Sequence, residues 1–432
     1  MAGVTEEPRN RPGEAREAPD GTPSRRGRAS APEPPPVARR SRRGLDWLVF
    51  FVADVQTGFG PFVAVFLSTQ KWTQVDIGLV LTIGGLVSLG GQIPLGALVD
   101  RLRSLRAAVV VSLLFIAGAA LAFALWPVFP VVVVSRVAHA VASSVLGLAL
   151  VALSVRIARE GHIGERLGRN AAFASAGTGI AAAVMGAAGY YLSSHAVFFL
   201  TALMVLPALF ALLRIRAQDI AVPSEAPAPR APRGDLAGGA LAIVRNRPLV
   251  IFAACVMLFH LANAAMLPLA ASLLTMRFSE TATVMVAAAM VVPQFTVTVL
   301  SPWVGRLAQS WGRRPLLLAG FGALVVRGLL FATVTAPELL VVIQILDGLS
   351  AAVLGVLVPL VVFDVAHEGG HFNLAQGTVG CAMGIGASIS TVLAGFAADH
   401  FGSYAAFELL AAIAGIGFLT VLLVMPETRP RR

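Results

Sequence analysis

Residues 338–363 read ELLVVIQILDGLSAAVLGVLVPLVVF, a stretch whose only ionisable side chains are Glu338 and Asp347. A helix needs about 20 mainly apolar residues to cross the hydrocarbon core of a bilayer. This stretch is long enough, so it predicts a membrane-spanning helix. The whole chain has the same character, since 57% of its residues are hydrophobic and 13% are charged, whereas soluble domains carry about 25% charged residues.

Twelve apolar stretches of this kind occur along the 432 residues. They cover residues 45–68, 75–99, 107–126, 128–155, 168–192, 196–214, 249–274, 281–304, 316–335, 338–363, 374–398 and 404–425. We therefore expect an all-α integral membrane protein with 12 transmembrane helices. The expected parts are a disordered cytoplasmic tail (1–44), a six-helix bundle (45–214), a Pro- and Ala-rich cytoplasmic linker (215–248), a second six-helix bundle (249–425) and a short tail (426–432).

The 33 Lys and Arg residues are unevenly placed. Most lie in the two tails and in alternate connections, while Lys71 and Arg277 lie in the other connections and Arg136 and Arg327 lie within spans. Basic residues favour the cytoplasmic side of a membrane. We therefore expect a multi-pass protein of the plasma (inner) membrane, with both termini cytoplasmic. The net charge of +10 is explained by this topology and the lipid bilayer, so no nucleic acid partner is expected.

Three other classes of site are disfavoured. The single lysine, Lys71, follows Gln70, and a Walker A loop requires Gly-Lys-Ser/Thr. Cys255 and Cys381 lie in apolar spans and suggest no disulfide framework. His367-Glu368-Gly369-Gly370-His371 matches a zinc-protease pattern, but its paired glycines disfavour the helix that this pattern needs. We expect no metal, no cofactor and no enzymatic activity.

The two halves of the chain repeat each other. Ser143-Ser144-Val145-Leu146-Gly147 matches Ala351-Ala352-Val353-Leu354-Gly355 at an offset of 208, and Gly96 matches Gly305 at an offset of 209. Matches at nearly one offset, about half the chain length, favour two parallel six-helix pseudo-repeats.

The stretch Gly305-Arg306-Leu307-Ala308-Gln309-Ser310-Trp311-Gly312-Arg313-Arg314 resembles the loop signature Gly-x-x-x-Asp-Arg/Lys-x-Gly-Arg-Arg of the major facilitator superfamily. Gln309 stands where the signature has Asp. The first copy keeps Gly96, Asp100 and Arg101 but lacks the later Gly-Arg pair. The resemblance covers residues 45–425. It implies the fold of that family and secondary active transport of a small organic solute by alternating access.

The same resemblance implies a cytoplasmic gate built from the two loop copies. Its residues would be Gly96, Asp100, Arg101, Arg106, Gly305, Gly312, Arg313 and Arg314. Asp100 would lie at the C-terminal end of a helix, where the helix dipole disfavours an anion. We therefore expect Arg101, Arg103 or Arg106 to hold it. The alternative for each arginine is plain anchoring at the membrane interface.

Four spans carry a polar pair at spacing i, i+3, which places both members on one helix face. The pairs are Asp54 and Thr57, Arg136 and His139, His260 and Asn263, and Gln344 and Asp347. The resemblance implies that these four spans line a central cavity. Thr57, His139, His260, Asn263 and Gln344 are thus candidates for contact with the solute, although both histidines fit a packed interior equally well.

Ionisable groups inside a membrane are expensive and mark candidate functional sites. We predict that Asp54 is the main proton carrier, that Asp347 is the second, and that Arg136 faces both. Burial and a nearby cation act in opposite directions on a carboxyl group, so such an acid can bind and release a proton. The alternative for each acid is a static ion pair. Arg327 either pairs with Asp347 or extends to the interface.

The sequence contains one indication for efflux and one against it. An acid in the inner half of the first span resembles drug–proton antiporters, which favours efflux. Gly177-Thr178 lacks the Gly-Pro pair of the family's antiporter signature, so uptake by symport stays as the alternative. A receptor that binds without translocating is a third class. We expect a monomer.

Overall fold

The computed structural model describes residues 3, 39–57, 62–158, 162–220, 236–277, 282–334, 336–366 and 371–429. Every regular element in this described part is a helix. The helices are α1 (Arg39–Thr57), α2 (Phe62–Thr69), α3 (Gln74–Arg101), α4 (Leu105–Leu125), α5 (Phe129–Ile157), α6 (Ile163–Tyr191), α7 (Ser194–Leu213), the 3-10 helix η1 (Ala217–Asp219), α8 (Leu236–Arg245), α9 (Arg247–Asn263), α10 (Met266–Arg277), α11 (Ala282–Ser310), α12 (Arg314–Thr333), α13 (Pro337–Ala366), α14 (Phe372–Phe401) and α15 (Ser403–Leu423).

Within these residues, 11 segments are long and apolar enough to cross a membrane. They correspond to predicted spans 2 to 12, and the seventh predicted span combines α9 with the start of α10. The predicted first span, 45–68, contains most of α1 and nearly all of α2, with residues 58–61 outside the described part. The all-α membrane fold is thus confirmed.

The first helix begins at Arg39, before the predicted boundary at residue 45. Ser41 explains the earlier start. Its hydroxyl donates to Asp219 Oδ2 at 2.5 Å and accepts from the backbone N–H of Arg216 at 3.1 Å. These bonds tie the beginning of α1 to the segment after α7. The predicted linker, 215–248, likewise contains η1 and α8.

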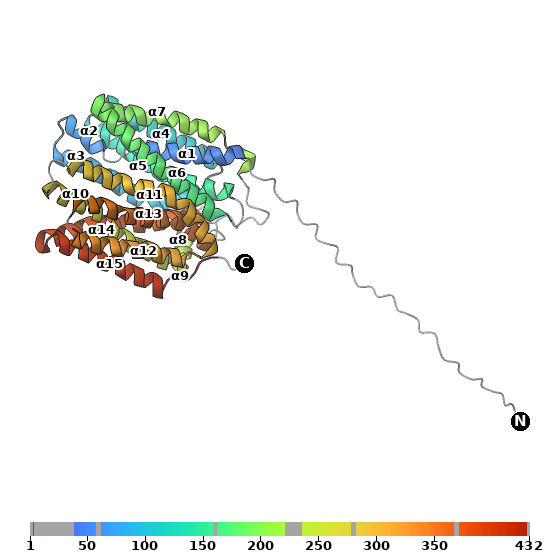
Figure 1. The fold of residues 1–432 in the computed structure, drawn as a ribbon. Coiled ribbons are helices and arrows are strands. Elements are labelled where there is room, and N and C mark those ends of the chain that lie inside the picture. Colours follow the sequence, from blue (N-terminus) through green and yellow to red (C-terminus); the bar gives the residue numbers. More distant parts are fainter. Residues whose placement is uncertain are drawn as a thin grey trace. The chain divides into compact units, whose positions relative to one another are not determined.

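Two hydrophobic cores hold the helices together. One is built mainly from α1–α7 and the other mainly from α9–α15, and we call these helices the N-terminal and C-terminal bundles. They are the blue-to-green and yellow-to-red groups of ribbons (Figure 1). In the N-terminal core Phe66, Phe123 and Phe198 are fully buried, with ring centroids 4.7–5.4 Å apart. Such close packing matters because dispersion, not exclusion of water, joins helices in lipid.

The two bundles meet along two seams, where α3 packs against α14 and α11 packs against α6. At four positions a glycine lies so close to a carbonyl group of the facing helix that a methyl group would overlap with it. The pairs are Gly96 with Asn373, Gly377 with Gln92, Gly305 with Gly164, and Gly168 with Ser301. Each pair of one seam becomes a pair of the other when its residue numbers shift by 209, the difference between 305 and 96. The repeat in the sequence is therefore also a repeat in space.

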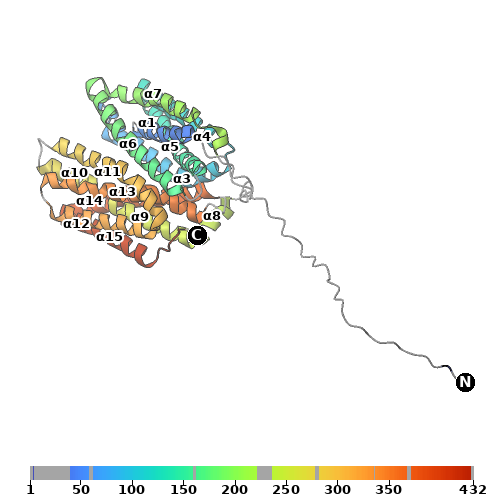
Figure 2. The ribbon, with the colours of Figure 1, turned by 45° about the vertical axis from the view of Figure 1, so that its right-hand side comes forward.

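These contacts lie toward the ends where α3 and α11 finish and where α14 and α6 begin. We call this the Arg-rich end, because the connections there carry most of the basic residues. The turned view shows both groups of helices running between this end and the opposite one (Figure 2).

Candidate functional site

Asp54 lies near the end of α1, one turn before residues 58–61. Asp54 is 7% exposed to solvent. Among the residues that the structure describes, its carboxylate makes no hydrogen bond and no ion pair, including none with Arg136. Two residues on, Gln56 donates from Nε2 to the Ser143 hydroxyl at 2.9 Å and thereby joins α1 to α5. Thr57 is the last residue of α1, and its side chain is outside the described part.

Arg136 and His139 occupy adjacent turns of α5, and both are half-buried. The Arg136 guanidinium packs against Gly84 of α3, and its Nη2 would lie 3.0 Å from a Cβ on that glycine. A larger side chain at Gly84 would push the guanidinium away. Arg136 is thus held against α3, in the N-terminal bundle that also contains Asp54.

The C-terminal bundle holds a second polar cluster around Arg327, which is 1% exposed. Arg327 Nη1 donates to Asn263 Oδ1 at 2.5 Å and to Asp347 Oδ1 at 2.8 Å, and Arg327 Nε donates to Gln344 Oε1 at 3.0 Å. Gln344 Nε2 donates in turn to the Ala289 carbonyl at 3.2 Å. The cluster therefore connects α9, α11, α12 and α13.

Arg327 pairs with Asp347, which resolves the two alternatives left by the sequence. The prediction that Arg136 faces Asp347 is wrong in one respect. The cation that binds Asp347 comes from α12 of its own bundle. The sequence held a signal for this pairing, since an arginine within an apolar span needs a partner. It could not name the partner, because helix spacing does not reveal how α12 faces α13.

The cluster leaves some hydrogen-bonding capacity unused. Within the described residues, Asp347 Oδ2 and Asn263 Nδ2 have no partner. His260 lies one turn before Asn263, and its buried Nε2 also lacks a partner there. Buried polar atoms are nearly always paired. These three groups can accept from or donate to a polar solute without placing a net charge beside it.

Asp100 binds the opposite bundle at the Arg-rich end. Its Oδ1 accepts from the backbone N–H and the side-chain Nδ2 of Asn373, at 3.0 and 2.7 Å, and its Oδ2 accepts from the N–H of Leu374 at 2.9 Å. These donors belong to the first turn of α14, whose backbone N–H groups have no partners within the helix. A helix N-terminus also favours an anion.

The prediction that an arginine of the same loop holds Asp100 is therefore wrong. Arg101 and Arg103 are exposed and Arg106 is half-buried. None of the three forms a hydrogen bond or ion pair with Asp100 in the described structure. The N-terminus of α14 takes the place of the expected cation. Sequence spacing could not indicate it, because 273 residues separate Asp100 from Asn373.

The second loop copy behaves differently at the equivalent position, Gln309. Its Nε2 would lie 2.8 Å from a Cβ on Gly164, so the amide lies over the start of α6. No hydrogen bond from its side chain is present among the described residues. In the seam between α3 and α14, the charged side chain of Asp100 thus binds across the two bundles. In the seam between α6 and α11, where Gln309 replaces the Asp of the signature, the described residues form no such bond.

The remaining signature residues stabilise the C-terminal bundle internally. Gly312 has φ +104°, a conformation that favours glycine. The Glu427 carboxylate accepts from the N–H groups of Arg313 and Arg314 at 2.9 and 3.1 Å and thereby caps α12. Arg313 also forms two hydrogen bonds with Asp364, at 2.7 and 3.2 Å. Sequence reasoning missed both Glu427 and Asp364, since their partners come from distant segments.

It also missed a buried cluster that joins α1, α5 and α6. Arg166 and Arg169 both bind Asp46, with Arg169 Nη2 2.5 Å from Asp46 Oδ2. Arg166 Nε donates to Asn170 Oδ1 at 3.0 Å, and Asn170 donates to the Ser154 hydroxyl at 2.6 Å. Arg166 and Asp46 are almost completely buried. This arrangement fits a static link between helices.

In the described part of the chain, no three His, Cys, Asp or Glu side chains are grouped as metal ligands. Residues 367–370 of the zinc-protease-like pattern are outside that part.

The family model of the Major Facilitator Superfamily matches residues 46–326 and 281–432. Two proteins described as uncharacterized MFS-type transporters of Mycobacterium tuberculosis, from strains CDC 1551 / Oshkosh and ATCC 25618 / H37Rv, are each 39% identical over 403 residues. The alignment covers 91% of this chain and 94% of each relative. The class B tetracycline resistance protein of Escherichia coli is 26% identical over 134 residues, which is 31% of this chain and 33% of that protein.

Among solved structures, a single-residue variant of the fucose:proton symporter FucP of E. coli is similar with a TM-score of 0.70 and 16% identity, over 88% of this chain and 98% of that one. FucP in the outward conformation also gives a TM-score of 0.70, with 17% identity over 88% and 97% of the chains. At this identity the likeness concerns the fold alone. Together with the family model and the relatives, it shows that the chain is an integral membrane transporter and belongs to the Major Facilitator Superfamily.

Proposed function

We propose that this transporter exports a small organic solute in exchange for protons and that Asp54 carries the proton. The observation behind the proposal is the isolation of the Asp54 carboxylate, which is 7% exposed and has no bonding partner among the described residues. A buried ionised carboxylate without a partner is unfavourable. Proton binding at Asp54 therefore relieves a real energetic penalty, and the group is suited to exchange protons when it becomes accessible.

Asp347 is less suited to this role. Arg327 binds it at 2.8 Å and is itself held by Asn263 and Gln344. A buried carboxylate with a fixed guanidinium partner has its charge compensated, and removing either partner leaves an uncompensated buried charge. Asp347 thus takes second place to Asp54, and the Arg327 cluster acts as a rigid and nearly neutral surface of the C-terminal bundle.

In the N-terminal bundle, Asp54 is the charge that we assign to the exchange. When Asp54 is ionised, it offers an anionic group to a cationic part of the solute. When a proton binds there, that group is neutral. Proton and solute then compete for one site, which is the requirement for exchange by alternating access.

The direction follows from this competition and from one relative. The stretch of 26% identity with a tetracycline resistance protein supports a solute that the cell removes. Uptake by symport is the second candidate. It would require the proton-loaded form to bind the solute more tightly, with Arg136 holding an anionic solute.

The setting of the proposed activity follows the same reasoning. We place the protein as a monomer in the plasma membrane, with both termini and the Arg-rich end cytoplasmic, and with two six-helix bundles that rock about the cavity between them. Its partners are the solute, the proton and the bilayer, and it performs no enzymatic step.

Transport in proteoliposomes tests this proposal. Radiolabelled tetracycline, tetraphenylphosphonium, fucose and an amino acid mixture provide cationic, neutral and zwitterionic probes. A probe that exchanges across the membrane in counterflow is a substrate. With an imposed pH gradient, the wild-type protein should move this probe against its concentration gradient. Asp54→Asn should reduce that movement to the level of empty liposomes, because the amide cannot release a proton.

Counterflow of the same probe is the control, since it needs no proton movement. Asp54→Asn should retain it at probe concentrations high enough to offset the loss of the anionic group. Full gradient-driven transport by Asp54→Asn would remove Asp54 from the mechanism. Accumulation in the same direction as the proton flow would establish symport instead of exchange.

A further inference from the structure

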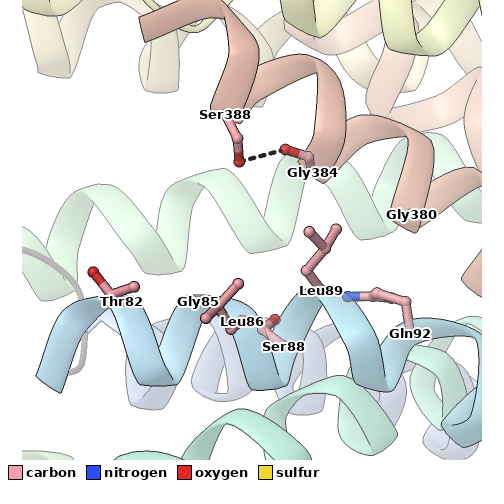
Figure 3. Close-up of a pocket in the computed structure, with 9 residues that line it drawn as sticks. All are labelled: Thr82, Gly85, Leu86, Ser88, Leu89, Gln92, Gly380, Gly384 and Ser388. Carbon is pink, nitrogen blue, oxygen red and sulfur yellow. Dashed lines mark hydrogen bonds between the residues drawn. The ribbon is translucent and has the colours of Figure 1, made fainter. Parts of the chain in front are cut away.

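A cavity of about 370 Å³ lies in the seam between α3 and α14. Figure 3 shows side chains of both helices lining it, with Leu89 and Gln92 of α3 opposite Gly380 and Gly384 of α14. At 1.5 Å per residue, Thr82 and Gln92 lie about 12 and 27 Å from the start of α3 at Gln74. The cavity is therefore at the depth of the hydrocarbon core.

The seam between α6 and α11 carries different side chains at the equivalent position. There a Cβ added to Gly179 would lie 3.8 Å from Gln294 Cβ. The offset of 209 that relates the seams places Gly85 at the position of Gln294 and Ser388 at the position of Gly179. Gly85 has no atom within 4 Å of an added Cβ, and both Gly85 and Ser388 line the cavity. The two seams thus differ in the residues that face each other at this depth, Gly85 with Ser388 in one and Gln294 with Gly179 in the other.

The lining residues of α3 lie on more than one side of the helix. Leu86 is 63% exposed. Ser88 is two residues further and points about 160° away, because each residue turns an α-helix by about 100°. A cavity lined by both of these residues and by α14 lies within the seam between the two helices.

The lining is also amphipathic. Leu86 and Leu89 are apolar, whereas Thr82, Ser88, Gln92 and Ser388 carry hydroxyl or amide groups, and no lining residue is charged. The Ser388 hydroxyl donates to the Gly384 carbonyl at 2.8 Å in its own helix and keeps its lone pairs for another donor. Volumes from about 300 Å³ upward suit small organic ligands.

From this geometry we infer that the gap between α3 and α14 is a lateral portal, through which an amphipathic solute dissolved in the bilayer enters the cavity between the bundles. This inference rests on the proposed function and specifies its substrate class. The solute has an apolar body and an uncharged hydrogen-bonding group at its leading end. A strongly hydrated solute such as a sugar would leave its shell of water at the portal and find only a few polar groups in return.

Access from the bilayer can be measured without knowing the solute. The full chain, with Cys255 and Cys381 replaced by alanine, receives one bimane-labelled cysteine at Ser88→Cys or at Leu86→Cys. It is reconstituted into liposomes with two separate quenchers, phosphatidylcholine brominated on its acyl chains and 11-bromoundecanol. Bromine quenches the label on contact. The matched variants Gly85→Gln and Gln294→Gly exchange the side chains that distinguish the two seams.

We expect bromoundecanol to quench the label at Ser88→Cys at least half as strongly as at Leu86→Cys. Gly85→Gln should suppress quenching at residue 88 and leave it unchanged at residue 86, because the glutamine fills only the gap. Gln294→Gly, in the other seam, should alter neither. Bimane at Gln92→Cys repeats the measurement where Ser88→Cys gives a poorly folded protein, as judged by size-exclusion chromatography.

Three results would overturn the portal. Quenching at residue 86 alone would mean that the gap is closed to the bilayer. Quenching at residue 88 that persists in Gly85→Gln would mean another route. Quenching at residue 88 by the brominated phospholipid but not by bromoundecanol would identify a fixed lipid site. Since none of these readings depends on proton coupling, an inactive Asp54 would not affect them.

Discussion

At the residue scale, the two intramembrane acids differ in what surrounds them. Asp54 is buried without a partner in the described structure, whereas Asp347 belongs to a cluster centred on Arg327. Both acids were predicted from the same signal, an ionisable side chain inside an apolar span. The sequence could identify them as unusual but could not separate them. Asp347 differs from Asp54 because another helix, α12, places a guanidinium beside it. Whether it does so depends on how α12 packs against α13.

This difference predicts opposite behaviour on mutation. Arg327→Met should destabilise the protein by about 3–5 kcal/mol, because it leaves the Asp347 carboxylate buried without its counter-charge. The double variant Arg327→Met/Asp347→Leu should recover most of that loss, since neither charge remains. Thermal unfolding in detergent, followed by tryptophan fluorescence, measures both.

The control is Asp54→Leu, which removes an acid with no partner and should leave the unfolding temperature unchanged or raise it. A double variant as unstable as Arg327→Met alone would contradict a simple ion pair. It would indicate that Asn263 and Gln344 depend on Arg327 for their own packing.

At the element scale, the main finding is the asymmetry between the two seams at the Arg-rich end. Asp100 of α3 caps α14, while Gln309 of α11 forms no equivalent bond with α6 in the described structure. The sequence showed the Asp-to-Gln replacement but indicated the wrong partner for Asp100. The partner of Asp100 is mainly a pair of backbone N–H groups at the start of α14. Every chain has such groups, so no sequence motif marks these as the partner. The close glycine contacts of both seams agree with the way small residues allow membrane helices to approach each other.

The cap should bias the conformational equilibrium. Asp100→Ala removes three hydrogen bonds that exist only while the Arg-rich end is closed. Hydrogen bonds to a charged group contribute about 1.5–3 kcal/mol each at most, and a coupling of 1–3 kcal/mol shifts an equilibrium by about 5- to 150-fold. We expect Asp100→Ala to raise the population open at this end.

Double electron–electron resonance between spin labels at the exposed positions Arg103→Cys and Arg306→Cys measures that population as a longer distance. The matched control is Gln309→Ala, at the pseudo-symmetric position, which should leave the distance distribution as in the parent. Equal responses of the two variants would show that Asp100 does not lock the seam.

At the scale of the whole molecule, the sequence was most informative about repetition. Eleven of the twelve predicted spans are single apolar segments in the described structure, and the offset between repeats recurs in the contacts of both seams. Apolar spans and internal repeats depend on composition and on the spacing of similar segments. Both can be read from a single sequence. Helix ends and inter-helix partners were predicted less well. The beginning of α1 depends on Ser41 and Asp219, 178 residues apart.

The two bundles also divide the chemistry between them. The N-terminal bundle contains the isolated Asp54 together with Arg136, and the C-terminal bundle contains a satisfied cluster with a few free polar atoms. The proposed portal between α3 and α14 joins this interior to the bilayer. In this view the N-terminal bundle responds to protons, the C-terminal bundle offers a fixed polar surface, and the gap between α3 and α14 selects amphipathic solutes.

The central claim is that solute and proton compete at Asp54, and proton release on solute binding tests it most directly. Purified protein in weakly buffered detergent solution is mixed with a probe that passed the counterflow assay, and a pH-sensitive dye reports the protons released. Because linkage is reciprocal, the wild-type protein should release up to about one proton per molecule, and Asp54→Asn should release none at a probe concentration high enough to occupy its weakened site. Equal release by both proteins, or proton uptake by the wild-type protein, would contradict the account.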